Sequence, residues 1–191
     1  MLEHARAEVE SYLGRHPQER PRLSALTAQL TDDADPFARS NMSGHITASV
    51  LVFDSGLEHV LLIHHKLYST WMQPGGHVEP SSNSLLESGR REVQEETGLS
   101  AAAVRPLLHG GALDIDTHRI AALPAKGEGE HQHHDFMFLA KTHHAFHPTP
   151  QLAEVNAVEW VPVGRFLQIS GPRMQHLAPK VRDFLSQATK R

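Results

Sequence analysis

The 191-residue sequence contains no cysteine, which excludes disulfide bonds and thiolate zinc sites. It also lacks any apolar run as long as a membrane span, so we expect no membrane partner. The first residues include Glu3, His4, Arg6 and Glu8, a charged start that a secretory signal does not tolerate. These absences together predict a cytoplasmic protein.

A broad basic surface is lacking as well, because 18 Lys and Arg face 22 Asp and Glu and the formal net charge is -4. Without such a field the chain cannot hold nucleic acid by its phosphate backbone, so no nucleic-acid partner is expected. A polyanionic small molecule would need local neutralisation, by a metal or by a few Arg and His. With 39% hydrophobic residues, the chain is long enough to bury one substantial core.

The N-terminal region is predicted to be helical. Apolar residues recur at helical spacing over residues 2–15, and a second helix is expected over residues 21–30. The polar stretch 31–44 is typical of a linker. We therefore divide the chain into a helical extension, residues 1–40, and a main domain, residues 41–191. The extension could cap a cleft or form a homodimer interface, and the sequence does not choose between these.

The main domain alternates strand and helix patterns, which predicts an α/β fold. A hairpin is expected where Asp54-Ser55-Gly56 joins two strand patterns, and a mobile loop is expected over the Gly- and charge-rich residues 124–134. Strands are predicted at residues 46–53, 60–63, 71–73, 113–120, 136–139 and 158–161, and helices at 84–97, from Pro162 onward, and up to about Lys190.

One stretch carries recognisable chemistry, the segment Arg-Glu-Val-Gln-Glu-Glu-Thr-Gly-Leu at residues 91–99. Its glutamates Glu92, Glu95 and Glu96 fall at i, i+3 and i+4, so a helix places them on one face. Like charges so placed repel, and a bare helix gains nothing from them. A divalent cation changes this balance, because carboxylate oxygens are the ligands that magnesium prefers.

The surroundings of these glutamates favour a metal site over a solvated acidic face. The pair Gly75-Gly76 comes before the helix, Arg91 precedes Glu92, and Gly98 is placed to end the helix. The N-cap is predicted among three consecutive polar residues, Ser81, Ser82 and Asn83.

This segment resembles the Nudix box, whose pattern is G-x5-E-x7-R-E-U-x-E-E-x-G-U with U aliphatic. Gly76 supplies the first glycine, and residues 91–99 match every specified position of the second half. Residues 71–79 are also similar to the strand and loop that lead into the box. Two departures occur: Ser82 stands where the pattern has a glutamate, and one extra residue precedes Arg91.

The resemblance covers roughly residues 44–165 and implies a Nudix-type α/β/α sandwich with a mixed sheet. It implies a hydrolase that uses Mg2+ or Mn2+ to cleave the phosphoanhydride bond of a nucleoside diphosphate derivative, with ADP-ribose or another such sugar favoured. The metals would offset the pyrophosphate charge and lower the pKa of the attacking water. The implied metal ligands are Glu92, Glu95, Glu96 and the carbonyl of Gly75, and Arg91 would orient a box carboxylate.

A second set of polar residues alternates along two strand patterns and would share one sheet face in each. Contact with phosphates, with a further metal or with the second half of the substrate is one interpretation. A solvated strand face is the other, and the two are evenly weighted. The residues expected to bind substrate are His77, Asp114, Asp116, His118 and His133, with His131 and Asp135 in the same alternating pattern.

A general base is expected in the loop before the last of these patterns. Glu130 is the first choice and Glu128 the second, since a loop can bring a carboxylate within reach of the attacking water. The remaining histidines near strand ends are interpreted as surface residues or as residues whose hydrogen bonds are satisfied within the fold, although a zinc site of His and Asp is compatible with their chemistry. These are His64, His65, His143, His144 and His147.

Two rival functions remain open at this point. A nucleotide-binding or sensor module without catalysis would account for Ser82, whereas the intact Glu92, Glu95 and Glu96 favour an enzyme. An isoprenoid diphosphate isomerase, also housed on this fold, is ranked last because it is expected to use a cysteine.

Overall fold

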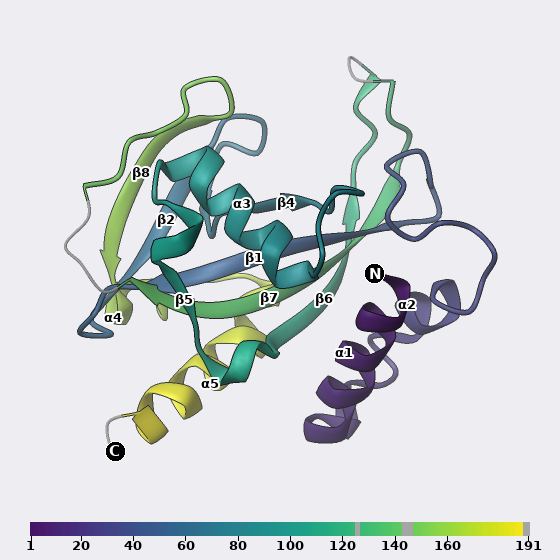
Figure 1. Ribbon diagram of the computed structural model, residues 1–191, viewed down its shortest axis with the longest axis horizontal. Coiled ribbons are helices and arrows are strands. Elements are labelled where there is room, and N and C mark those ends of the chain that lie inside the picture. Colours follow the sequence, from purple (N-terminus) through teal and green to yellow (C-terminus); the bar gives the residue numbers. More distant parts are fainter. Residues whose placement is uncertain (125–126, 143–146, 189–191) are drawn as a thin grey trace.

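The computed structural model describes residues 1–124, 127–142 and 147–188. A mixed sheet forms its centre, with α3 over one face and α5 beneath the other, while α1 and α2 pack beside β6 (Figure 1). The helices are α1 (Leu2–Arg15), α2 (Ser24–Gln29), α3 (Leu85–Thr97), α4 (Val163–Phe166) and α5 (Pro172–Ala188). The strands are β1 (His45–Phe53), β2 (His59–His65), β3 (Thr70–Met72), β4 (Gly75–His77), β5 (Val104–Pro106), β6 (Ala112–Ile120), β7 (His131–Thr142) and β8 (Val155–Pro162).

The sheet is built around the parallel pair of β1 and β7. Its path runs β3-β2-β1-β7-β5, while β4 joins β1, β6 joins β7 and β8 joins β2. The β1–β7 register places His45 opposite His133 and Ser49 opposite Met137. The expected hairpin is also present, since β1 and β2 pair antiparallel next to the turn, with Phe53 opposite Val60. The predicted α/β/α sandwich with a mixed sheet is therefore confirmed.

The prediction of a loop over residues 124–134 is wrong in its second half. Strand β7 begins at His131, so residues 131–134 are paired in the sheet, while 125–126 lie outside the described residues. Polar residues form a strand here because β1 and β6 flank β7 on both sides and satisfy its backbone groups.

The start of α3 also differs from expectation. Its N-cap is Ser84, one residue beyond the predicted set, and the Ser84 hydroxyl accepts a hydrogen bond from the Glu87 N–H at 3.1 Å. The Glu87 carboxylate in turn accepts a hydrogen bond from the Asn83 N–H at 2.9 Å, an arrangement close to a capping box. Ser84 is favoured as the N-cap because a glutamate lies three residues after it, which is not the case for Ser81, Ser82 or Asn83. The predicted end is confirmed, because Gly98 adopts the left-handed conformation with φ of 75°.

Packing of α3 on the sheet depends on a small residue. A Cβ atom at Gly89 would lie 2.8 Å from a Val50 side-chain carbon, so the helix approaches β1 more closely than alanine would allow. Leu85 and Val93 are fully buried on the same face of α3. On the other sheet face, α5 buries Leu177 and Val181 against a second apolar cluster. None of the helices within the described residues is both long and apolar enough to cross a membrane.

The N-terminal extension packs on the main domain rather than projecting from it. Ala5, Val9 and Leu13 of α1 are buried in the same apolar cluster as the α3 face of the sheet. The apolar side of α1 is thus covered within one chain. The second helix is shorter than predicted, and a 3-10 turn, Pro17–Glu19, precedes it.

A cluster of charges holds the extension to α5 and β6. Glu19 contacts Arg22, and Lys180 of α5 lies 2.7 Å from Glu19 and 2.6 Å from Asp114 of β6. Tyr12 joins the cluster with a hydroxyl 3.1 Å from Asp114. Burial alone would raise the pKa of Glu19, but the bonds from Lys180, Tyr12 and Arg22 outweigh it and lower the pKa from 4.5 to about 2.

The depressed pKa predicts that Glu19 contributes to acid stability. A carboxyl whose pKa is lower in the folded state stabilises the fold above its unfolded pKa, and the contribution is lost as pH falls toward 2. Glu19→Gln should therefore lower the free energy of unfolding by about 3 kcal/mol at pH 7, the size expected when one partner of a buried ion pair is removed. Thermal melts between pH 7 and pH 2.5 should show a smaller acid-induced fall in the variant.

The matched control is Glu3→Gln, since Glu3 pairs with Arg6 in an exposed ion pair. That variant should follow the wild-type melting curve at every pH. Equal pH dependence in wild type and Glu19→Gln would contradict the assignment of a low pKa to Glu19.

Candidate functional site

The predicted glutamates of α3 lie over the Gly75-Gly76 strand. Glu96 accepts a hydrogen bond from the Gly75 N–H at 3.0 Å, and a Cβ atom at Gly76 would come within 2.7 Å of the Glu92 carboxyl carbon. Gly75 is equally constrained on its other side, where a Cβ atom would lie 2.4 Å from the Ser49 Cβ. Two glycines are thus required where β4 passes between α3 and β1. The structure brings Glu92, Glu96 and Gly75 together as the sequence predicts.

Arg91 ties these parts to one another. Its guanidinium lies 2.6 Å from Glu92 and 2.6 Å from Glu95, and it donates to the His77 carbonyl at 3.0 Å. Glu79, in the loop after β4, lies 3.6 Å from the same guanidinium. Glu79 is not among the residues predicted for the site, although it is an acidic residue in the interval where the box pattern lacks its glutamate.

The three box glutamates differ in environment. Glu92 and Glu96 are buried, whereas about half of the Glu95 side chain is exposed. Burial raises the pKa of Glu92 to about 7, against the opposing charge of Arg91. Burial also raises the pKa of Glu96 to about 8, with the nearby charges of Glu92 and Glu154 adding to the effect and the Gly75 N–H opposing it.

Such carboxyls suit a divalent cation. Two buried acidic groups that repel each other are costly as ions, and a bound cation would favour the charged form of both. The donor set of Glu92, Glu95 and Glu96 consists of hard oxygen atoms, as magnesium and manganese require. The residues present therefore fit the metal that the resemblance implies, and their role as its ligands stays a prediction.

A further carboxylate, Glu154, belongs to the surroundings of the box. The segment before β8 is tied to the end of α3, because Thr149 donates to the Thr97 carbonyl at 2.9 Å and Gln151 donates to the Glu96 carbonyl at 3.2 Å. Glu154 follows in this segment with an exposed side chain, and its charge raises the pKa of both buried glutamates. Sequence reasoning missed it, since nothing in the pattern of residues 147–154 signals proximity to α3.

The predicted base Glu130 lies elsewhere. It pairs with Arg119 across the β6–β7 hairpin, and both side chains are half or more exposed. No hydrogen bond or ion pair among the described residues joins Glu130 to the box glutamates. Glu128, the second choice, lies in the loop of the same hairpin. It pairs at 2.6 Å with Arg39, which belongs to the segment before β1.

Asp114 and Asp116 of β6 both contact basic side chains. Asp114 is fully buried beside Lys180, as described above. Asp116 contacts Arg22 at 2.9 Å and His118 at 2.9 Å. Burial alone would raise the pKa of Asp116, but the His118 bond and nearby arginine charges lower it to about 2. The structure thus places Asp114 within the cluster that holds the extension, while Asp116 and His118 lie together at its border.

Asp135 is a buried carboxylate on the same sheet face, and it is contacted by several polar side chains. It accepts hydrogen bonds from Thr47 at 3.1 Å and Ser49 at 2.7 Å, and it pairs with Arg173 of α5 at 2.5 Å. Arg173 was missed because the C-terminal helix gives no sequence signal of a polar contact. Its Nε is buried without a hydrogen-bond partner among the described residues.

The predicted substrate-binding histidines His77 and His133 meet at the start of β7. Their ring centroids lie 5.2 Å apart, and His118 lies 5.8 Å from His133. Two further histidines, His45 and His131, pack into the same group, with centroids 4.8 Å apart. Burial lowers the pKa of His77 to about 3 and that of His133 to about 2, with repulsion between the rings adding to the effect. The imidazoles of His77 and His133 are therefore neutral at neutral pH.

The other histidines considered in the sequence do not belong to this group. His64 contacts Asn156 at 3.0 Å, His65 accepts a hydrogen bond from the Leu67 N–H at 3.1 Å, and His147 is exposed. His143 and His144 lie outside the described residues.

Solved structures share this architecture. An Ap4A hydrolase from C. elegans, in a binary complex, superposes with a TM-score of 0.57 at 18% identity, over 74% of this chain and 98% of that one. RenU, a Nudix hydrolase from M. smegmatis, gives 0.55 at 19% identity, over 75% and 88%. The NUDIX domain of Shewanella oneidensis NrtR, complexed with ADP ribose, gives 0.51 at 19% identity, over 83% and 97%. At these identities the likeness concerns the fold.

The comparison with curated proteins gave no match. The model of the NUDIX domain matches residues 44–181, which is most of the chain and includes the complete glutamate helix, the Gly75-Gly76 strand and the main part of α5. By this match and by the shared fold, the chain belongs to the Nudix family.

Proposed function

We propose that the protein hydrolyses the phosphoanhydride bond of a nucleoside diphosphate derivative with the help of Mg2+ or Mn2+. The observation that carries this proposal is the convergence of two buried carboxyls, Glu92 and Glu96, on the Gly75-Gly76 strand. Burial raises the pKa of both carboxyls, even though Arg91 contacts Glu92. When bound there, the metal would neutralise the phosphates and acidify the attacking water.

The protein's own groups act by holding the ligand atoms in place. Arg91 bonds to Glu92 and to the His77 carbonyl, so it sets the spacing between α3 and the end of β4. The Gly75 N–H holds one oxygen of the Glu96 carboxyl, and in this proposal the other oxygen binds the cation. Preorganised ligands of this kind lower the cost of reorganisation during the reaction.

ADP-ribose or another nucleoside diphosphate sugar is the proposed substrate class. The basic groups near β6 and β7 are few and are paired with carboxylates, as with Arg22 and Asp116 and with Arg173 and Asp135. A substrate with a short diphosphate needs less neutralisation than a longer polyphosphate chain. The solved complex of a related fold with ADP ribose supports this choice, and the similar fold of the Ap4A hydrolase makes Ap4A the main competitor.

A panel of ADP-ribose, other nucleoside diphosphate sugars and Ap4A, each with Mg2+ and with Mn2+, tests the substrate class. We expect the highest kcat/KM for ADP-ribose, with AMP and ribose 5-phosphate as products. Faster cleavage of Ap4A would contradict this choice while leaving the phosphoanhydride reaction intact.

Replacement of a buried box carboxyl tests the metal seat. Glu96→Gln should reduce kcat/KM at least about 100-fold, the usual effect of removing one preorganised active-site interaction. It should also weaken Mn2+ binding, which titration followed by electron paramagnetic resonance measures directly. The control is Glu87→Gln on the same helix, because glutamine preserves the capping bond to Asn83.

The outcomes separate an enzyme from a binding module. Wild-type protein that binds ADP-ribose but releases no product with either metal would support a nucleotide-binding module and overturn the proposal. Unchanged activity and Mn2+ binding in Glu96→Gln would show that the metal binds elsewhere.

The general base is proposed to be one of two carboxylates, the predicted Glu130 or Glu154, and the electrostatic coupling of Glu154 to the box favours it. Glu154→Gln should lower kcat about 100-fold with little change in Mn2+ binding, because general-base catalysis contributes about 10²- to 10⁴-fold. Glu130→Gln should change kcat little. The reverse pattern would assign the base to the β6–β7 hairpin.

A further inference from the structure

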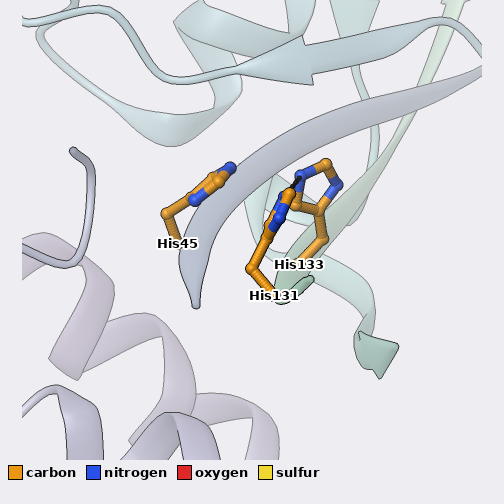
Figure 2. Close-up of side chains that lie close together, drawn as sticks. All are labelled: His45, His131 and His133. Atoms are coloured by element: carbon orange, nitrogen blue, oxygen red, sulfur yellow. Dashed lines mark hydrogen bonds between the residues drawn. The ribbon is translucent and has the colours of Figure 1, made fainter. Parts of the chain in front are cut away.

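We infer that His45, His131 and His133 form a zinc site distinct from the carboxylate site on α3. Figure 2 shows the three imidazoles facing one another, His45 from the first residue of β1 and the other two from the start of β7. One ring nitrogen from each residue lies within 4.8 Å of the others. The inference goes beyond the proposed hydrolysis, which uses oxygen ligands and other side chains.

The spacing of the nitrogens suits tetrahedral zinc. At a Zn–N distance of about 2.0 Å, two ligands of a tetrahedral site lie about 3.3 Å apart. The Nε2 atoms of His131 and His133 are separated by 3.2 Å. This pair is therefore already at ligand spacing, and His45 lies close enough to complete the set by side-chain rotation.

The outer hydrogen bonds orient the rings for metal binding. Nδ1 of His131 lies 2.8 Å from the Gly129 carbonyl, which can only accept, so Nδ1 carries the proton and Nε2 keeps its lone pair. Nδ1 of His45 faces the Asn41 carbonyl in the same manner at 3.5 Å. A carbonyl behind the distal ring nitrogen is the usual arrangement around zinc-bound histidine.

His77 supplies the fourth ligand in this proposal. Its Nε2 lies 3.0 Å from the Nε2 of His45, again the spacing of two zinc ligands. Thr47, two residues after His45, pairs with His77 in the sheet, so β1 and β4 hold the two rings side by side. Four imidazoles would give a closed site, which is typical of a structural rather than a catalytic zinc.

The ligand chemistry selects zinc over magnesium. Imidazole nitrogen suits zinc and other late transition metals, whereas magnesium requires oxygen ligands. His45 and His131 are almost completely buried, so the ring nitrogens face one another rather than solvent, and a metal binds the neutral form of imidazole. The two proposed metal sites would thus select different metals, because one offers nitrogen ligands and the other offers oxygen ligands.

The position of the site gives it a structural consequence. Zinc would join the starts of β1 and β7 to the end of β4, two residues beyond Gly75. Because the His77 carbonyl accepts from Arg91, a fixed β4 also fixes the guanidinium that holds Glu92. Zinc is therefore expected to stabilise the whole fold and the approach of β4 to α3.

Zinc binding to the full-length protein tests this inference. After removal of metals with a chelator, the wild type should bind one zinc ion per chain in a calorimetric titration with zinc alone. Millimolar Mg2+ should not compete. His133→Gln and His45→Gln should each weaken zinc binding by more than about 100-fold, since the loss of an outer partner alone costs about 10- to 100-fold. Zinc should raise the melting temperature of the wild type only.

The control is His4→Gln, an exposed helical histidine far along the chain from the cluster, which should bind zinc as the wild type does. Histidine ring NMR signals of the wild type provide a readout that needs no variant. Zinc should shift the Nε2 signals of the cluster and leave that of His4 unchanged. No zinc uptake by the wild type, equal uptake by the two cluster variants, or unshifted cluster signals would each overturn the inference.

Discussion

The parallel pairing of β1 with β7 is the constraint on which the rest of the structure depends. It brings two strands distant in sequence into register, with His45 opposite His133. Both strands alternate, so one face of the pair carries apolar residues toward α3 and the other carries polar residues at its beginning. The carboxylate seat and the histidine cluster both rest on this pair, the first through β4 and the second directly.

The close approach of β4 to α3 gives the box glutamates their unusual environment. At Gly75 and Gly76 the strand β4 lies between β1 and α3 with no room for a Cβ atom on either residue. Glu92 and Glu96 are therefore held against a backbone strand and away from water, and their pKa values rise. Glutamates that would repel one another in solution are thereby brought together at the position proposed for a cation.

On the sheet face covered by α5, buried carboxylates form ion pairs with basic side chains. Arg173 compensates Asp135, and Lys180 compensates Asp114, so both of these buried carboxylates have a basic partner from α5. Of the two buried box glutamates, Glu92 is paired with Arg91, whereas no ion pair to Glu96 is found among the described residues. Buried carboxylates are thus neutralised by ion pairs in the cluster that holds the extension in place, and less completely so at the site proposed for a metal.

Much of the local structure follows from the sequence. The bounds of α1, the hairpin after β1, the end of α3 at Gly98 and the common face of the three box glutamates could all be predicted, because they depend on periodicity and on local backbone geometry. The Ser84 cap was within reach of the same reasoning, since its partner Glu87 is three residues away.

Contacts between distant segments could not be predicted in this way. Strand β7 starts among histidines because β1 and β6 satisfy its backbone from both sides, and Glu154 gains significance only because its segment bonds to the end of α3. The sequence by itself determined the family and the glutamates that face one way on a helix. Only the tertiary structure decided which charges are compensated and which histidines meet, because both depend on strand register and on burial, which no short spacing along the chain encodes.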